Sequence, residues 1–227
     1  MDIIEAISQR RSIRAFKPDL VPQEILGEII ELSLRAPSWG NTQPWEFATV
    51  SGRELEEIRI GFIEKAGEEP TPDIKHPQQF PEPYDTRLRA IVATLHGIMG
   101  IRREDREGRA RWQLQQSRHF EAPCVIYIYI DRSFYFQPDG LNVWPIFDCG
   151  LVAENIMLLA TNYGLGTVPQ AEAAILPDVV RKVLRIPDSK LIVIGIAIGY
   201  PNWPNPISQF RSEREPLDKV AKWYGFD

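Results

Sequence analysis

The stretch PIFDCGLVAENIMLLATNYGLGTVPQ, residues 145–170, decides the fold. Apolar residues recur in its first part with little charge, at Leu151, Val152 and Ile156 among others, and this pattern predicts a helix buried on most sides. Gly164 is expected to end the helix, and the following residues are typical of a tight turn into a strand. The turn is not a dinucleotide-binding fingerprint, because it lacks G-x-G-x-x-G and follows a helix.

Apolar runs outside this stretch predict further strands at 45–50, 124–130 and 191–200. Periodic or charged stretches predict helices after Asp2, over 22–35, 51–65 and 177–184, and over 85–118 with a break near 100–108. With 227 residues, 44% of them hydrophobic, the chain can bury the core of one domain. We therefore expect a single α+β domain over residues 1–227.

Helix ends carry their own signals. Asp2 is expected to cap the first helix, and Pro22 lies near the start of the second. That helix should end just before Pro37, because the residue before a proline avoids helical geometry. Ser51 and Glu54 have the spacing of a capping box and are expected to open the third helix.

Two segments stand apart from this pattern. Five prolines lie between residues 70 and 83 and predict a long surface excursion at about 67–85, of the kind that serves as a lid or is disordered. The tail at about 201–227 is polar but carries too many apolar side chains to be free in water. It is expected to pack either on its own core or on a second subunit.

Composition excludes several classes of function. A net charge of −5 and a pI near 5.4 argue against nucleic acid or an acidic membrane surface as the main partner. No apolar run approaches the roughly 20 residues that a bilayer requires, so we expect a cytoplasmic protein. Cys124 and Cys149 are expected to be buried thiols, and the three histidines lack the spacing of a zinc site. No G-x-S-x-G elbow is present.

The basic segment RRSIR, residues 10–14, is a candidate anion site. If it is extended, Arg10, Ser12 and Arg14 project from one face, and two guanidinium groups beside a hydroxyl suit a phosphate. The alternative is that these cations only complement the dipole at the end of the first helix.

The segment RAPSWGNTQPW, residues 35–45, places amide and hydroxyl groups beside two indole rings. Ser38, Asn41 and Gln43 with Trp39 and Trp45 offer the stacking area and hydrogen bonds that a heteroaromatic ligand needs. The alternative is a turn whose tryptophans cap the core. Elsewhere, Asp148 and Glu154, six residues apart, could form an acid pair, although the pattern favours cap and partner residues.

Five segments in this order resemble the FMN-dependent nitroreductase family. They are IIEAISQRRSIRAF, LRAPSWGNTQPWEF, DCGLVAENIMLLATNYGLGTVPQ, GIAIGYP and SEREPLDKV, and together they cover nearly the whole chain. The resemblance implies a three-layer α+β fold with a central mixed sheet flanked by helices. It also implies a homodimer with FMN at the subunit interface and a C-terminal extension that wraps the partner.

The resemblance also implies the site residues. Arg10, Arg11, Ser12 and Arg14 would hold the FMN phosphate and pyrimidine edge, and Arg214 of the C-terminal RxPL motif would reach the phosphate. Backbone of Pro169, Gln170 and Ala171 would face the flavin near N5, with Gln116 at the flavin edge. Pro37, Ser38, Trp39 and Asn41 would come from the neighbouring subunit. Trp39, bulkier than is common there, and Phe120 would line the substrate pocket.

The implied activity is oxidation of NADH or NADPH by hydride transfer to FMN, followed by reduction of a small aromatic acceptor in the same space. Nitroaromatics or quinones are the expected acceptors, and no side-chain acid, catalytic triad or metal is required. A specialised reductive dehalogenase, a flavin-fragmenting enzyme and a non-enzymatic FMN-binding protein remain alternatives.

Overall fold

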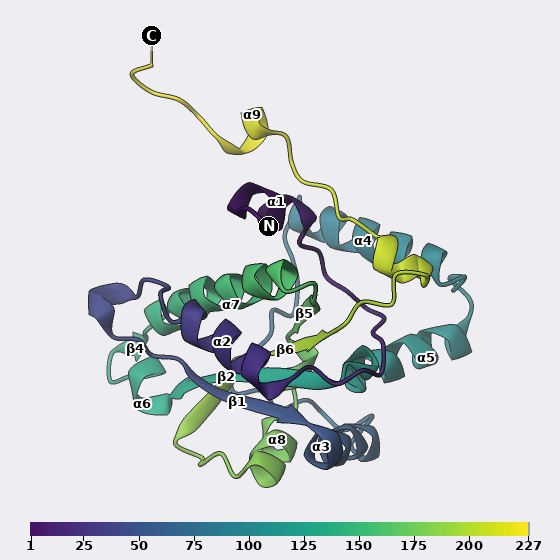
Figure 1. The fold of residues 1–227 in the computed structure, drawn as a ribbon, viewed down its shortest axis with the longest axis horizontal. Helices are drawn as coiled ribbons and strands as arrows, with labels where there is room; N and C mark the ends of the chain where they lie inside the picture. Colours follow the sequence, from purple (N-terminus) through teal and green to yellow (C-terminus); the bar gives the residue numbers. More distant parts are fainter. Residues whose placement is uncertain (227) are drawn as a thin grey trace.

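A computed structural model of the chain describes residues 1–226. Its centre is a four-stranded sheet in the order β1-β2-β6-β5 (Figure 1), with neighbouring strands antiparallel. The strands are β1 (Glu46–Ser51), β2 (Cys124–Asp131), β5 (Gly166–Gln170) and β6 (Lys190–Gly199). An isolated parallel bridge from Ser12 to Thr167 lies beside β5, so the sheet that was predicted to be mixed is antiparallel except at this bridge.

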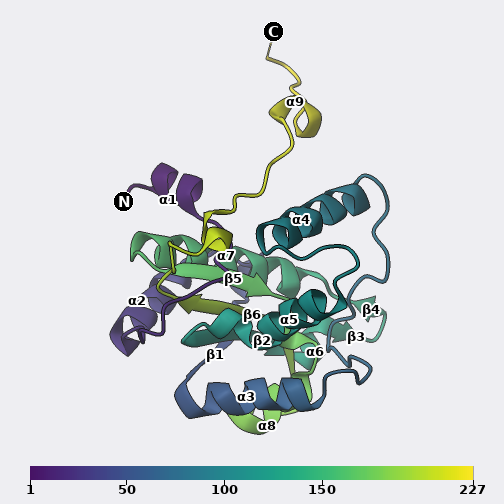
Figure 2. The same ribbon diagram turned by 90° about the vertical axis from the view of Figure 1, so that its right-hand side faces the viewer.

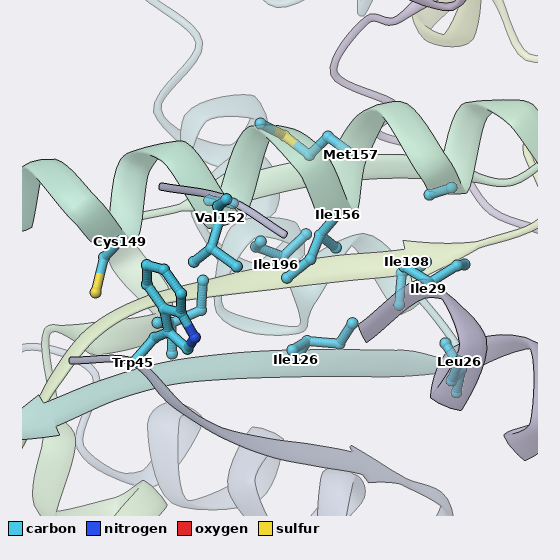
Figure 3. Close-up of a cluster of buried hydrophobic side chains, with 14 of the residues drawn as sticks. Leu26, Ile29, Trp45, Ile126, Cys149, Val152, Ile156, Met157, Ile196 and Ile198 are labelled. Carbon is cyan, nitrogen blue, oxygen red and sulfur yellow. The ribbon is translucent and has the colours of Figure 1, made fainter. Parts of the chain in front are cut away.

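Helices cover both faces of the sheet and form three layers. Helices α2 (Gln23–Ser33) and α7 (Trp144–Asn162) lie on one face, and α3 (Gly52–Glu64) and α8 (Pro177–Leu184) lie on the other (Figures 1 and 2). Figure 3 shows Val152 and Ile156 of α7 directed at Ile196 and Ile126 of the sheet. The predicted burial of α7 is confirmed, because Val152 and Ile156 expose none of their surface.

The remaining elements lie around this sandwich. They are α1 (Ile3–Gln9), α4 (Tyr84–Ile98), α5 (Arg106–Ser117), α6 (Arg132–Tyr135), α9 (Leu217–Val220), the hairpin of β3 (Phe136–Gln137) and β4 (Gly140–Leu141), and four 3₁₀ turns, Trp39–Asn41, His119–Glu121, Glu172–Ala174 and Pro206–Gln209. The predicted break in the charged helical stretch falls between α4 and α5. No helix within residues 1–226 has the length and apolar character needed to cross a membrane.

The structure confirms one of the two predicted helix caps and contradicts the other. Asp2 caps α1 as expected, because its Oδ1 accepts a hydrogen bond of 2.8 Å from the backbone N–H of Glu5. The capping box predicted at Ser51 and Glu54 is wrong, since the Ser51 side chain makes no capping hydrogen bond. Gly52 follows with a φ of 61°, and this left-handed residue turns the chain into the helix without a side-chain cap.

The proline-rich excursion is fastened near its middle. Within the described part of the chain, no helix or strand lies between Glu64 and Tyr84. The backbone N–H of Thr71 donates to the Ile175 carbonyl at 3.1 Å. The buried Asp73 carboxylate accepts from Arg181, from Arg132 at 3.2 Å and from the Ile192 backbone at 2.8 Å. This part of the excursion is therefore held against α8 and β6.

The tail divides into two parts. Its first part packs on the body of the chain, where Ile207 is buried and Trp203 lies under the Arg11 guanidinium. Its second part leaves the body (Figures 1 and 2), and its apolar side chains from Leu217 to Phe226 are exposed. The tail thus covers its own core only as far as the turn at Pro206–Gln209.

Candidate functional site

The basic segment runs in extended form beside strand β5. Ser12 pairs with Thr167, and the Ile13 N–H donates to the Thr167 carbonyl at 2.9 Å. Ile13 is buried on the core side, so its neighbours Ser12 and Arg14 lie on the other side of the segment. Gly166 permits this approach, because a Cβ there would lie 2.5 Å from Cγ1 of Ile13.

The cations of this segment have few acidic partners. Arg10 Nε lies 3.4 Å from Glu154 Oε1 on α7, outside hydrogen-bond geometry. Burial lowers the pKa of Arg11, and the nearby Arg211 lowers it further. Burial also lowers the pKa of Arg14, against an opposing effect of Glu172. Two guanidinium groups that lie near each other, as those of Arg11 and Arg211 do, favour an anionic ligand.

Unpartnered polar atoms mark the same edge of the sheet. Among the described residues, four buried side-chain atoms here lack any hydrogen-bond partner, namely Nε of Arg10, Nε of Arg11, Oγ1 of Thr167 and Oε1 of Gln170. Buried polar groups are normally paired, so these atoms are the ones that a bound ligand would satisfy. Guanidinium donors fit a phosphate, and a hydroxyl and an amide oxygen fit the polar edge of a ring. These residues therefore suit FMN.

The end of β5 contributes Pro169, Gln170 and Ala171. Gln170 is buried, and its Nε2 donates to the backbone carbonyl of Gln116 at 3.2 Å. Gln116 thus meets this region through its main chain, and its side chain borders a neighbouring cavity of about 750 Å³ between α3 and α5. Glu172 borders the same cavity. A bound molecule in that cavity would therefore lie beside the end of β5.

A second cavity, of about 410 Å³, lies on the other side of α5. Arg14, Arg111, Trp112 and Phe120 are among its lining residues. Phe120 is only 4% exposed, and its ring centroid lies 5.5 Å from that of Trp112. Trp112 borders both cavities. The aromatic pair thus forms a wall next to Arg14.

Phe120 sits in a left-handed turn that the sequence did not predict. His119, Phe120 and Glu121 have φ values of 54°, 53° and 58°, although none of them is glycine. The left-handed conformation costs a non-glycine residue on the order of 1–3 kcal/mol, and it persists only when the surrounding structure stabilises it. Buried Arg59 of α3 does so here, donating to the carbonyls of the two flanking residues, Arg118 at 3.0 Å and Ala122 at 2.6 Å.

The same turn buries a neutral histidine. His119 stacks on Phe62 and shares a hydrogen bond of 3.0 Å between Nε2 and the Tyr127 hydroxyl. Burial first, and the Arg59 charge second, lower the pKa of His119 to about 3. Burial raises the pKa of Tyr127. Both groups are uncharged near neutral pH and act in packing.

The two tryptophans of residues 37–45 lie in different environments. Trp45 is buried in the core, as the alternative of a core-capping turn predicts, whereas Trp39 is 61% exposed. The Ser38 hydroxyl accepts from the Gln43 N–H at 2.9 Å, and Gln43 Nε2 donates to Asn41 Oδ1 at 3.2 Å. These bonds fix a turn that presents Trp39 and Asn41 to solvent.

Within one chain, this turn and the basic segment attach to different parts of α7. The Trp39 N–H donates to the buried Asp148 carboxylate at 3.1 and 3.3 Å, whereas Arg10 faces Glu154. Six residues along a helix correspond to about 9 Å of axial rise and to different sides of the helix. Asp148 and Glu154 are thus not an acid pair: Asp148 accepts from the Trp39 backbone, and Glu154 faces Arg10.

Arg214 is not brought to the basic segment in the single chain. Its guanidinium bonds locally, to Ser212 and to the Glu213 carbonyl. Arg211 is the tail cation that lies near Arg11, and its Nη1 donates to the Ser8 carbonyl at 2.7 Å. Sequence reasoning missed Arg211, which directly precedes the SEREPL segment, because only the folded chain brings it near Arg11. Residues 1–226 hold no cluster of three or more potential metal ligands.

Comparisons with known proteins show which family and which solved structures the chain resembles. The model of the nitroreductase family matches residues 7–200. The chain is 31% identical to a chloronitrobenzene nitroreductase of Comamonas testosteroni, over 96% of this chain and 95% of the relative. It is 29% identical to a 4-nitrobenzoate reductase of Pseudomonas putida, over 100% and 97% of the two chains.

Solved structures show the same fold. An FMN- and NADPH-dependent nitroreductase NfnB from Sphigopyxis sp. strain HMH superposes with a TM-score of 0.92 at 30% identity, over the full length of both chains. The FMN-dependent nitroreductase NfnB from Mycobacterium smegmatis, in complex with NADPH, gives a TM-score of 0.89 at 27% identity, over 98% of this chain and 100% of that one. The chain belongs to the nitroreductase family.

Proposed function

We propose that this protein is an FMN-dependent NAD(P)H oxidoreductase that reduces nitroaromatic or quinone-type acceptors by a ping-pong mechanism. The observation that carries the proposal is the cluster of unpartnered polar atoms at the β5 edge, on Arg10, Arg11, Thr167 and Gln170. The relatives named as nitroreductases, at about 30% identity over nearly the whole chain, support the choice of acceptor.

Each part of the site has a proposed task. Arg10, Arg11 and Ser12 bind the FMN phosphate, with Arg214 reaching it from the tail, and Arg14 faces the polar edge of the ring. The main chain at Pro169–Ala171 supports the reactive side of the flavin. Bound FMN supplies the two-electron chemistry, and the protein positions its ring and shields it from water. The cationic surroundings favour a negatively charged flavin over a neutral one.

We propose that the functional unit is a homodimer and that the Ser38–Asn41 turn of each subunit completes the site of the other. The turn is exposed and lies away from the basic segment of its own chain. Apolar side chains are also exposed on α1 at Ile3, Ile4 and Ile7 and in the tail beyond Leu217. Burying these groups against a second subunit would remove them from water. The proposed location is the cytoplasm.

The acceptor space is proposed to lie next to the aromatic wall of Trp112 and Phe120. The cavities on both sides of this wall, about 410 and 750 Å³, are large enough for a small aromatic molecule. Trp39 of the second subunit would narrow the entrance. A small, flat acceptor is therefore the favoured substrate class.

The test is an absorption spectrum of the purified protein, followed by anaerobic addition of NADH and then NADPH. We expect flavin bands that bleach with at least one donor and recover when a nitroaromatic is added. The double substitution Arg14→Ala and Arg214→Ala should release the flavin, while Arg53→Ala, at an exposed position on α3, should retain it. A protein without flavin, or a bound flavin that both donors leave oxidised, would contradict the proposal.

The dehalogenase alternative has weaker support. An iodotyrosine dehalogenase homologue of Caenorhabditis elegans is 23% identical, and the chain covers 60% of it. Turnover of a nitroaromatic and a halogenated phenol by the reduced enzyme separates the two activities. We expect the nitroaromatic to be the faster substrate.

A further inference from the structure

The cavity of about 750 Å³ is lined partly by helices and partly by the proline-rich excursion. Helices α3, α4 and α5 contribute side chains such as Phe62, His96 and Trp112. The first part of the excursion, residues 65–70, also borders the cavity and is named here the loop wall. The space that the cavity offers to a ligand therefore depends on where the loop wall is held.

The loop wall makes local contacts and is attached to the body of the protein at its end. The Glu68 N–H donates to the Lys65 carbonyl at 3.0 Å, and Lys65 Nζ lies 3.9 Å from Glu68 Oε2. Directly after Pro70, the Thr71 N–H donates to the Ile175 carbonyl at 3.1 Å. Ile175 borders the same cavity, so this bond joins the loop wall to another part of the cavity lining. One such hydrogen bond contributes little by itself.

Asp73, two residues further along the chain, provides the stronger attachment. Its side chain is 6% exposed and accepts hydrogen bonds from Arg181 of α8, from Arg132 of α6 at 3.2 Å and from the Ile192 N–H of β6 at 2.8 Å. Removing one partner of a buried ion pair is strongly destabilising, because the other charge is then left unpaired away from water. The Asp73 carboxylate therefore holds the excursion against three separate elements.

Beyond this attachment the excursion is open to solvent. Ile74 packs against the core, whereas residues 75–84 are exposed. The part of the excursion that is held in place thus directly follows the part that borders the cavity.

We infer that Asp73 is a specificity-determining positioning residue, whose buried ion pairs hold the loop wall in one place and so set the size of acceptor that the cavity admits. The inference rests on the proposed acceptor space beside Trp112, which borders this cavity. Three directional hydrogen bonds define a single position for the loop wall. A wall that does not yield favours small, flat acceptors, because a wider ring system cannot push it aside.

The experiment follows flavin reoxidation by stopped flow, after anaerobic mixing of the pre-reduced, FMN-loaded enzyme with nitrobenzene or 1-nitronaphthalene. The dependence of the rate on acceptor concentration gives an apparent Kd and a limiting rate. Wild type should prefer nitrobenzene. Asp73→Asn keeps the shape of the side chain and removes its charge. It should raise the apparent Kd for nitrobenzene about tenfold and leave that for 1-nitronaphthalene within about twofold of wild type. The limiting rate and the Kd for FMN should stay at their wild-type values.

Asp178→Asn is the matched control. Asp178 pairs with the same Arg181, its Oδ1 lying 3.1 Å from Nη1, but its side chain is 72% exposed and its removal leaves Asp73 in place. This variant should match wild type with both acceptors. If Asp73→Asn does not fold, Arg132→Gln takes its place, because Arg132 is partly exposed and supplies one of the three hydrogen bonds. It should raise the apparent Kd for nitrobenzene about threefold.

Limited proteolysis with trypsin reports on the loop wall itself. In wild type, cleavage should occur after the exposed Lys75 and be slow after Lys65, whereas Asp73→Asn should be cut after both. An unchanged acceptor preference in Asp73→Asn, the same change in Asp178→Asn, or a Lys65 site as resistant as in wild type would overturn the inference. Wild type that binds no FMN, or that reduces neither acceptor, would instead overturn the proposed function.

Discussion

The buried His119 should make stability depend on pH in a way that one substitution removes. Its folded-state pKa of about 3 lies below the usual 6.5, so the unfolded chain binds a proton that the folded chain does not bind between these values. The contribution of neutral His119 to the free energy of unfolding is fully present above pH 6.5, and it is lost as the pH falls toward 3. Between pH 7.5 and 5, the loss from this one group is about 2 kcal/mol.

The perturbation is His119→Gln, which keeps a polar group near the Tyr127 hydroxyl but does not titrate. Urea unfolding at several pH values, with the same excess of FMN in all samples, gives the free energy of unfolding of each protein. Carboxylates contribute equally to both proteins and cancel in the difference. Wild type should therefore lose about 2 kcal/mol more than the variant between pH 7.5 and 5.

The control is His76→Gln, because His76 is exposed. This variant should follow the wild-type curve at every pH. Parallel curves for wild type and His119→Gln would refute the reasoning, since they would mean that folding does not suppress protonation of His119.

Three further substitutions test the packing around the site. Asp148→Ala leaves the Trp39 N–H without its carboxylate and should lower the free energy of unfolding by about 2 kcal/mol, measured in urea. Gly166→Ala brings a methyl group against Ile13 and should cost about 1–3 kcal/mol, lowering the Tm by roughly 2–4 °C per kcal/mol. Gly97→Ala, inside α4 with open space at its Cβ, should raise stability by about 0.5–1 kcal/mol. A Tm for Gly166→Ala at or above that of Gly97→Ala would contradict this account.

The layered fold was predictable because its signals are local. The strands β1, β2 and β6 and the helix α7 were predicted from the spacing of apolar residues. Each of these elements begins and ends within a residue or two of its expected bounds. Family membership and the three-layer α+β fold, predicted from five ordered segments, are confirmed by the family match and by the superposed structures. Buried, unpaired thiols at Cys124 and Cys149 are confirmed as well.

What the sequence could not show depends on contacts between distant residues. The left-handed turn at 119–121 contains no glycine, and Arg59, which stabilises it, lies about sixty residues earlier in the chain. The two tryptophans of residues 35–45 look alike in sequence, yet Trp45 enters the core and Trp39 does not. Arg211 also escaped notice, because only the folded chain brings it near Arg11.

The flavin site shared between subunits remains a prediction, and a mixed dimer tests it most directly. Neither the Arg14→Ala nor the Asn41→Ala homodimer should hold FMN firmly. If Arg14 and Asn41 of different subunits build each site, a heterodimer of the two variants, purified with two tags, regains one intact site. It should bind about one FMN and show about half of the wild-type NAD(P)H oxidation. A heterodimer as empty as either homodimer would contradict the shared site.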